Sequence, residues 1–163
     1  MTIVEKNLIE ECKSVRGTSV RTDKHLAPIY DCIKSKVKAN ELANVLPKKA
    51  ITPTQRKTYD LRYEDESGEH AIELKSINGS SAKNINNRLE EMSGQSWSAK
   101  SIYGHETFSY VFVINCPRSE EIKERIYEYA RCLREDGYLD RFSIYDTYSC
   151  SFYKTDSFES WHF

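Results

Sequence analysis

Residues 59–75 read YDLRYEDESGEHAIELK and have the pattern of two β-strands joined by a turn. Apolar and polar side chains alternate in residues 59–63 and again in residues 70–75, which is the period of a strand with one buried face. The segment Asp65-Glu66-Ser67-Gly68 supplies the turn, because Gly68 adopts φ > 0 at little cost. A loop centred between Glu66 and Ser67 places Asp60 directly opposite Glu73 in the hairpin.

Two carboxylates that face each other across a hairpin repel, because their Cβ atoms lie about 4.5–5.5 Å apart. A divalent cation between them turns the repulsion into a ligand set, and Mg²⁺ is held by one or two carboxylates together with waters and phosphate oxygens. Lys75 lies on the same face as Glu73, where its ammonium can hold an attacking water or neutralise charge on a phosphate. Asp60, Glu73 and Lys75 therefore predict phosphodiester hydrolysis, and a solvated Glu/Lys face is the alternative.

The order of Asp60, the hairpin and Glu73-Leu74-Lys75 resembles the signature of the PD-(D/E)XK nuclease superfamily. Residues 75–91, KSINGSSAKNINNRLEE, are similar to the segment after the catalytic lysine in type II restriction endonucleases of the XhoI-like group. The likeness covers residues 60 to about 100. Two features depart from the pattern: Tyr59 stands where many members have proline, and the chain is shorter than those enzymes.

This resemblance implies a restriction-endonuclease-like core, an α/β fold with a mixed β-sheet flanked by helices, in a single domain over residues 1–163. It implies Asp60 and Glu73 as the Mg²⁺ ligands and Lys75 as the residue that positions the attacking water. That core often adds an acidic residue from its first helix. Glu11 is the predicted acid here, and Glu10 and Asp31 remain alternatives.

Basic and amide side chains, which are suited to bind DNA, follow Lys75 in the sequence and also precede the hairpin. Asparagine is a poor helix former, so the asparagines after Lys75 are either N-terminal caps or contacts to phosphates and base edges. Lys48 and Lys49 belong to a basic loop that either follows a DNA backbone or connects two elements in solvent. Gln95 and Trp97 either support the site or pack behind it. The predicted DNA contacts are Lys83, Asn84, Asn86, Asn87, Arg88, Lys48 and Lys49.

Composition is that of one globular domain of 163 residues with a net charge of −1. Residues 1–60 carry twelve Lys/Arg against seven Asp/Glu, which permits a basic face for phosphates. No apolar run reaches the length of about 18 residues that a membrane span needs. The N-terminus lacks the features of a signal peptide, and the five cysteines form no C-x-x-C pair, so we expect a cytoplasmic protein with reduced thiols. The spacing of the four histidines matches no zinc site.

Hydrophobic periodicity predicts the order α–α–β–β–α–β–α–β. We expect a helix over residues 3–15, a second from about 23 to 46, a third from about 81 to 101, and a fourth capped by Ser119 and ended by Gly137. Residues 108–114 are apolar on both faces and predict a buried central strand. Residues 141–153 predict one or two further strands.

These features together predict a Mg²⁺-dependent endonuclease that cuts double-stranded DNA, of the type II restriction class and active as a homodimer. The apolar tail offers interface material, unless it belongs to the core: Phe158, Trp161 and Phe163 with the tyrosines at 145, 148 and 153. Rival predictions on the same core are a homing, junction or repair nuclease. A rival of another class is a non-catalytic DNA-binding or inhibitory protein.

Overall fold

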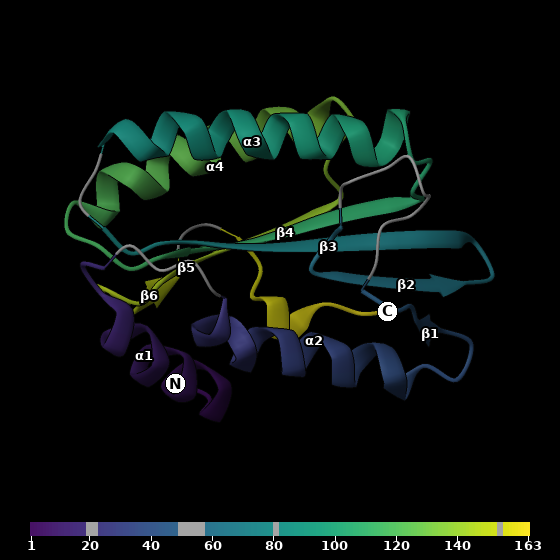
Figure 1. Cartoon of the computed structure of the whole chain (residues 1–163), viewed down its shortest axis with the longest axis horizontal. Coiled ribbons are helices and arrows are strands. Elements are labelled where there is room, and N and C mark those ends of the chain that lie inside the picture. The colour runs from purple at the N-terminus through teal and green to yellow at the C-terminus, as the bar shows by residue number, and fades with distance from the viewer. Residues whose placement is uncertain (19–22, 49–57, 80–81, 153–154) are drawn as a thin grey trace.

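A mixed six-stranded β-sheet lies between two layers of helices in the computed structural model (Figure 1). Residues 1–18, 23–48, 58–79, 82–152 and 155–163 are described, with the backbone alone for residues 82–84 and 152. The helical elements are α1 (Ile3–Val15), η1 (Lys24–Leu26), α2 (Ala27–Ala39), α3 (Ala82–Ser101), α4 (Ser119–Glu135) and η2 (Phe158–Ser160). The strands are β1 (Asn44–Val45), β2 (Leu61–Asp65), β3 (Gly68–Ile77), β4 (Thr107–Ile114), β5 (Arg141–Asp146) and β6 (Ser151–Phe152).

The strands follow one another across the sheet in chain order. The pairs β1–β2, β2–β3 and β5–β6 are antiparallel, whereas β3, β4 and β5 run parallel. The crossover helices α3 and α4 cover one face, and α1, α2 and η2 cover the other (Figure 1). This is an α/β fold with a mixed sheet flanked by helices, as predicted. A helix precedes the β2–β3 hairpin, and a helix and a strand follow it, which is the order that the resemblance implies.

The β2–β3 hairpin has the predicted register. Leu61 pairs with Ile72 and Asp65 with Gly68, so the next position outward from Leu61 and Ile72 sets Asp60 against Glu73. Gly68 has a φ of +135°, and a Cβ there would lie 2.8 Å from Cγ of Glu106. Only glycine meets both conditions without strain, so the turn chemistry fixes the register.

Alternate residues of the central strands enter two separate hydrophobic clusters. Ala71 of β3 belongs to the cluster under α3 and α4, whereas Ile72 and Leu74 belong to the cluster under α1 and α2. Strand β4 supplies buried side chains to both clusters, which confirms the predicted central strand. Glu73 and Lys75 therefore project from the face of β3 that α3 covers.

The second helix ends earlier than predicted, at Ala39. The backbone N–H of Leu42 donates to Oδ1 of Asn40, and the N–H of Ala43 donates to the carbonyl oxygen of Asn40. Asn40 thus closes a turn that competes with the helix. The chain then pairs Asn44 and Val45 with β2 as strand β1, so pairing at the sheet edge overrides the apolar pattern that continues to Leu46.

The fourth helix begins one residue away from the predicted cap. Arg118, with φ of 63°, holds the N-cap position, and Ser119 is the first helical residue. The Ser119 hydroxyl instead hydrogen-bonds the carboxylate of Asp146 at the end of β5. The helix ends as predicted, because Gly137 takes φ of 83° and donates its N–H to the carbonyl of Arg134.

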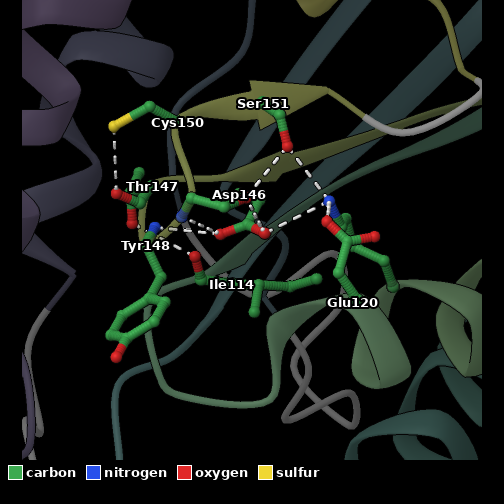
Figure 2. Close-up of polar contacts among 9 residues, drawn as sticks. Ile114, Glu120, Asp146, Thr147, Tyr148, Cys150 and Ser151 are labelled. Atoms are coloured by element: carbon green, nitrogen blue, oxygen red, sulfur yellow. Dashed lines mark hydrogen bonds and ion pairs between the residues drawn. The ribbon is translucent and has the colours of Figure 1, made fainter.

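A buried ion pair fastens α4 to the end of β5. Nζ of Lys123 lies 3.3 Å from the Asp146 carboxylate and 2.7 Å from that of Glu120, and it donates to the Ser151 hydroxyl at 3.0 Å. Lys123 is 2% exposed and Asp146 is fully buried. Figure 2 shows Glu120 and Ser151 converging on the side of Asp146 away from Thr147 and Tyr148. We call Lys123, Glu120, Asp146 and Ser151 the Asp146 cluster.

Most of the described residues of the aromatic tail belong to the core, which is one of the two roles expected for them. Phe158 is fully buried, Trp161 is 5% exposed and Tyr145 is 1% exposed. Phe163 packs edge-on against Tyr63 with ring centroids 5.4 Å apart. Tyr148 is exposed, and Tyr153 lies outside the described residues. None of the helices in the described ranges is long and apolar enough to pass through a membrane.

Candidate active site

Just before β2, the carboxylates of Asp60 and Glu73 accept hydrogen bonds from backbone N–H groups across the hairpin. The Asp60 N–H donates to Oε1 of Glu73 at 3.0 Å, and the Leu74 N–H donates to Oδ2 of Asp60 at 2.8 Å. Each acid therefore holds the backbone of the opposite strand. This exchange fixes both carboxylates in place, and it places them next to each other as the pairing register predicted.

Glu73 is buried beneath α3. Its side chain is 3% exposed, and its Oε2 accepts a hydrogen bond of 2.7 Å from Nε2 of Gln95 in α3. A buried carboxylate is costly to ionise unless donors compensate it. The amide of Gln95 and the N–H of Asp60 supply that compensation, so Gln95 supports the site, which is one of the two roles expected for it.

Lys75 is held by a carboxylate from the same helix. Its Nζ lies 3.0 Å from Oε1 of Glu91, and Arg88 lies 3.0 Å from the other oxygen of Glu91. Burial raises the pKa of Glu91, but the hydrogen bonds and charges of Lys75 and Arg88 outweigh it and hold that pKa below its ordinary value. Glu91 is therefore an anion that fixes two cations beside Glu73.

Two buried polar atoms near Glu73 have no hydrogen-bond partner among the described residues. One is Oε1 of Gln95, and the other is the hydroxyl of Tyr110. The backbone of Tyr110 in β4 lies next to that of Glu73 in the register of β3 and β4. Burial raises the pKa of Tyr110 far above its ordinary value, and the charges of Glu73, Glu91 and Asp60 raise it further. Tyr110 thus stays a neutral phenol. Unpartnered buried groups of this kind suit a site that takes up water or a ligand oxygen.

A pocket of about 350 Å³ opens beside Asp60 on the α2 side. Lys24, Lys48 and Tyr30 line it with Asp60 and Leu74. Nζ of Lys48 lies 3.6 Å from Oδ1 of Asp60, whose side chain is 15% exposed. The structure thus joins the predicted backbone-binding lysine to the predicted metal ligand, and Lys24 adds a cation that the sequence did not single out.

The acids predicted from the first helices do not join this group. Glu11 and Asp31 line a cleft between α1 and α2 that includes neither Asp60, Glu73 nor Lys75. Glu10 forms an exposed ion pair with Lys13. Glu91 supplies an acid from α3 instead, within 3.5 Å of the Gln95 amide that also holds Glu73.

The predicted DNA contacts on α3 lie on different faces of the helix. Arg88 lies on the site side through its pair with Glu91, and Asn87 is exposed. Asn86 accepts a hydrogen bond from Arg125 of α4, so it turns away from Glu91, about 140° around the helix. Lys83 and Asn84 occupy the first turn of α3, but their side chains lie outside the described residues, as does Lys49.

The donor set suits a hard cation with few protein ligands. Within the described ranges, no group of three or more His, Cys, Asp or Glu side chains is placed to hold an ion. Asp60 and Glu73 are two neighbouring carboxylates, and Mg²⁺ binds in this way when waters and phosphate oxygens complete its shell. The residues present therefore fit Mg²⁺ better than an ion that needs a full protein cage.

Sequence reasoning missed the role of Glu91, although Glu91 belongs to the run that resembles restriction endonucleases. Its signal was the spacing Arg88–Glu91–Gln95, which puts a cation, an acid and an amide on one face of a helix. The pattern alone did not show which strand that face would meet. Trp97 is 49% exposed.

Sequence comparison finds no protein family that matches this chain and no match among curated proteins. Among solved structures, SfsA of Pyrococcus furiosus in complex with Ca²⁺ is similar, with a TM-score of 0.39 and 15% sequence identity. The match covers 81% of this chain and 61% of the SfsA chain, so this chain spans less than two thirds of that protein. Similarity at this level bears on no activity, and the residues described above carry the functional interpretation.

Proposed function

We propose that this chain is a Mg²⁺-dependent endonuclease that hydrolyses phosphodiester bonds in double-stranded DNA. The observation that carries the proposal is the meeting of Asp60 and Glu73 across one hairpin, with Lys75 on the Glu73 face. Each of the three is held by a named partner: Asp60 by Leu74, Glu73 by Gln95 and Lys75 by Glu91. A solvated Glu/Lys face, the rival interpretation, would leave Glu73 exposed, whereas it is 3% exposed.

Asp60 and Glu73 would hold the cation, which when bound supplies Lewis-acid polarisation of the phosphate and a more acidic water. Lys75 then acts on the reacting group. Its ammonium donates hydrogen bonds to the attacking water or to a phosphate oxygen whose charge grows as the bond to the leaving oxygen breaks. Glu91 holds the Lys75 ammonium at the site through their ion pair, and Gln95 keeps the Glu73 carboxylate oriented.

The approach to DNA combines sequence-independent and sequence-reading groups. Lys48 and Lys24, which line the pocket beside Asp60, would bind backbone phosphates. Arg88 and Asn87 on α3 carry the side-chain types that read base edges in the major groove. We propose on this basis that cleavage occurs at a defined sequence, as in a type II restriction enzyme. Glu11 has the least support as a further acid, since it lies in the cleft between α1 and α2.

Cutting both strands in one encounter requires two such sites, because each site hydrolyses one strand. A homodimer with a two-fold axis matches the symmetry of a palindromic duplex. We propose this assembly on the chemistry alone, because three of the tail residues expected to form the interface, Tyr145, Phe158 and Trp161, are buried in the core. Light scattering at micromolar concentration, with and without duplex DNA, tests it.

The experiment that tests the function is incubation of mixed supercoiled plasmids with the protein and Mg²⁺, with chelator as a control. Discrete fragments support a sequence-specific endonuclease, and a smear supports a nuclease without sequence preference. Nicked circles alone point to a nicking or repair enzyme. DNA binding without metal-dependent cutting would overturn the proposal in favour of a non-catalytic DNA-binding protein. The same assay on Lys75→Ala tests the role of Lys75 and should show loss of cutting. Its matched control is Lys38→Ala, which removes an exposed lysine of α2.

A further inference from the structure

A groove with a volume of about 650 Å³ runs between α3 and α4 on the outer surface of the molecule. Its apolar lining comes from Leu89 of α3 and from Tyr129, Cys132 and Leu133 of α4. Tyr129 is 37% exposed, so part of its ring reaches the surface of the groove. On α3, the exposed ring of Trp97 follows Glu90 at i+7 and so continues the same side of that helix.

Acidic residues surround this apolar floor. Glu90, Glu124, Glu128 and Asp136 line the groove, and Arg125 is the one basic residue among the lining side chains that the structure describes. Arg125 donates a hydrogen bond to Asn86 across the two helices, and Arg131 pairs with Glu128 from outside the groove. With Arg125 and Arg131 both counted, the described side chains of the groove still carry a net negative charge beside a hydrophobic strip.

This combination selects among possible occupants by charge. A nucleic acid backbone is repelled by this net negative charge, so the groove is a poor surface for DNA. A second copy of this chain that bound with its own groove would place like charges against like charges, which costs several kcal/mol in an interface. A helix with leucines on one face and lysines or arginines beside them matches both the floor and the rim.

We propose that the groove between α3 and α4 is a docking site for a basic amphipathic helix of a partner protein. Helix α3 then makes contacts on two of its faces. Glu91 and Gln95 meet the catalytic hairpin, and Asn86 and Glu90 meet the partner on the other side of the buried stripe. A partner that shifts or stiffens α3 is thereby coupled to the residues that hold Glu73 and Lys75, whatever reaction those residues perform.

The test measures binding of labelled synthetic peptides of eighteen residues to the full chain by fluorescence polarisation. One peptide has leucine at i, i+3, i+4 and i+7 with lysine elsewhere, and its counterpart has glutamate in place of lysine. The groove variants are Glu90→Lys with Asp136→Lys, and Tyr129→Ala. The control, Glu41→Lys with Glu66→Lys, makes the same change in net charge at exposed positions outside the groove.

The lysine peptide is expected to bind and the glutamate peptide to fail. The groove charge reversals and Tyr129→Ala should each weaken binding by about tenfold or more, whereas the control should leave it nearly unchanged. Melting temperatures near that of the parent protein show that the variants fold. Equal binding of both peptides, or equal losses in the groove and control variants, overturns the proposal. It is also overturned if the chain forms dimers that Tyr129→Ala dissociates, since a second copy then occupies the groove.

Discussion

Replacing Lys123 by methionine tests whether the Asp146 cluster stabilises the fold. Methionine keeps an unbranched side chain that is one atom shorter, and it removes the charge. Glu120 is 75% exposed, so its pair with Lys123 contributes little. Asp146 has no exposure to water, and it loses an ammonium at 3.3 Å. Breaking a buried pair costs about 3–5 kcal/mol of unfolding free energy.

The lower end of that range applies, because Asp146 keeps other donors. The backbone N–H groups of Tyr148 and Ser149 each lie 2.9 Å from Oδ1, and the Ser149 hydroxyl lies 2.5 Å from Oδ2. We therefore expect a loss of about 3 kcal/mol, which lowers the melting temperature by about 6–12 °C in a domain of this size. The reference variant is Arg131→Met, which removes an exposed cation from two exposed carboxylates on the same helix and should change stability far less.

The loss should depend on pH with a definite sign. Burial raises the pKa of Asp146, but its hydrogen bonds to Ser149, Ser119 and Lys123 hold that pKa below its ordinary value. A carboxyl with a lowered pKa stabilises the fold above its unfolded pKa of about 3.9, and this stabilisation disappears as the pH falls through the folded value. The gap between Lys123→Met and the parent should therefore be widest near neutral pH and narrow in acid.

Thermal and urea unfolding between pH 3 and pH 7 measure these effects. A Lys123→Met protein that melts within about 2 °C of the parent at pH 7 would refute the account of a buried stabilising pair. A gap that widens in acid would refute the sign of the linkage. The double variant Lys123→Met with Asp146→Asn should recover part of the lost stability, because it removes the uncompensated buried charge.

The remaining predictions concern the candidate site. Gln95→Leu removes the donor to Glu73, so metal affinity measured by titration calorimetry should fall by about 10–100-fold; unchanged affinity would assign Gln95 to packing alone. Arg88→Ala should cost about 1–3 kcal/mol of discrimination between cognate and random duplexes, and equal losses on both would make it a backbone contact. Lys48→Ala should reduce the slope of log affinity against log salt by roughly one, and an unaltered slope would place Lys48 outside the DNA interface.

Local patterns predicted the hairpin well, because strand alternation and turn chemistry act over a few residues. The turn at Asp65–Gly68 predicted the register, and the register set Asp60 against Glu73. The long third helix and the central strand were equally predictable, since their apolar residues recur at regular spacing. The predicted end of the second helix was wrong, because the apolar pattern continues after Asn40 although the chain there pairs with β2 as strand β1.

Contacts between distant segments decided what the sequence did not reveal. Glu91 and Gln95 share a face of α3, but only the packing of α3 on the sheet brings that face to Glu73 and Lys75. The sequence does not distinguish Asn86 from Asn87, but only the packed structure shows that Asn86 hydrogen-bonds to α4. The aromatic tail resembled surface material for a dimer, whereas Phe158 and Trp161 complete the core under α2.

The central claim is that Asp60, Glu73 and Lys75 form one catalytic unit on the β2–β3 hairpin. Single-turnover cleavage of duplex DNA in Mg²⁺ tests it most directly, with the three single alanine variants, the triple variant and Lys38→Ala compared at equal concentration. The account predicts that each single variant loses nearly as much rate as the triple variant, because residues that serve one transition state are strongly non-additive. A folded Lys75→Ala protein that cuts at close to the parental rate would contradict it.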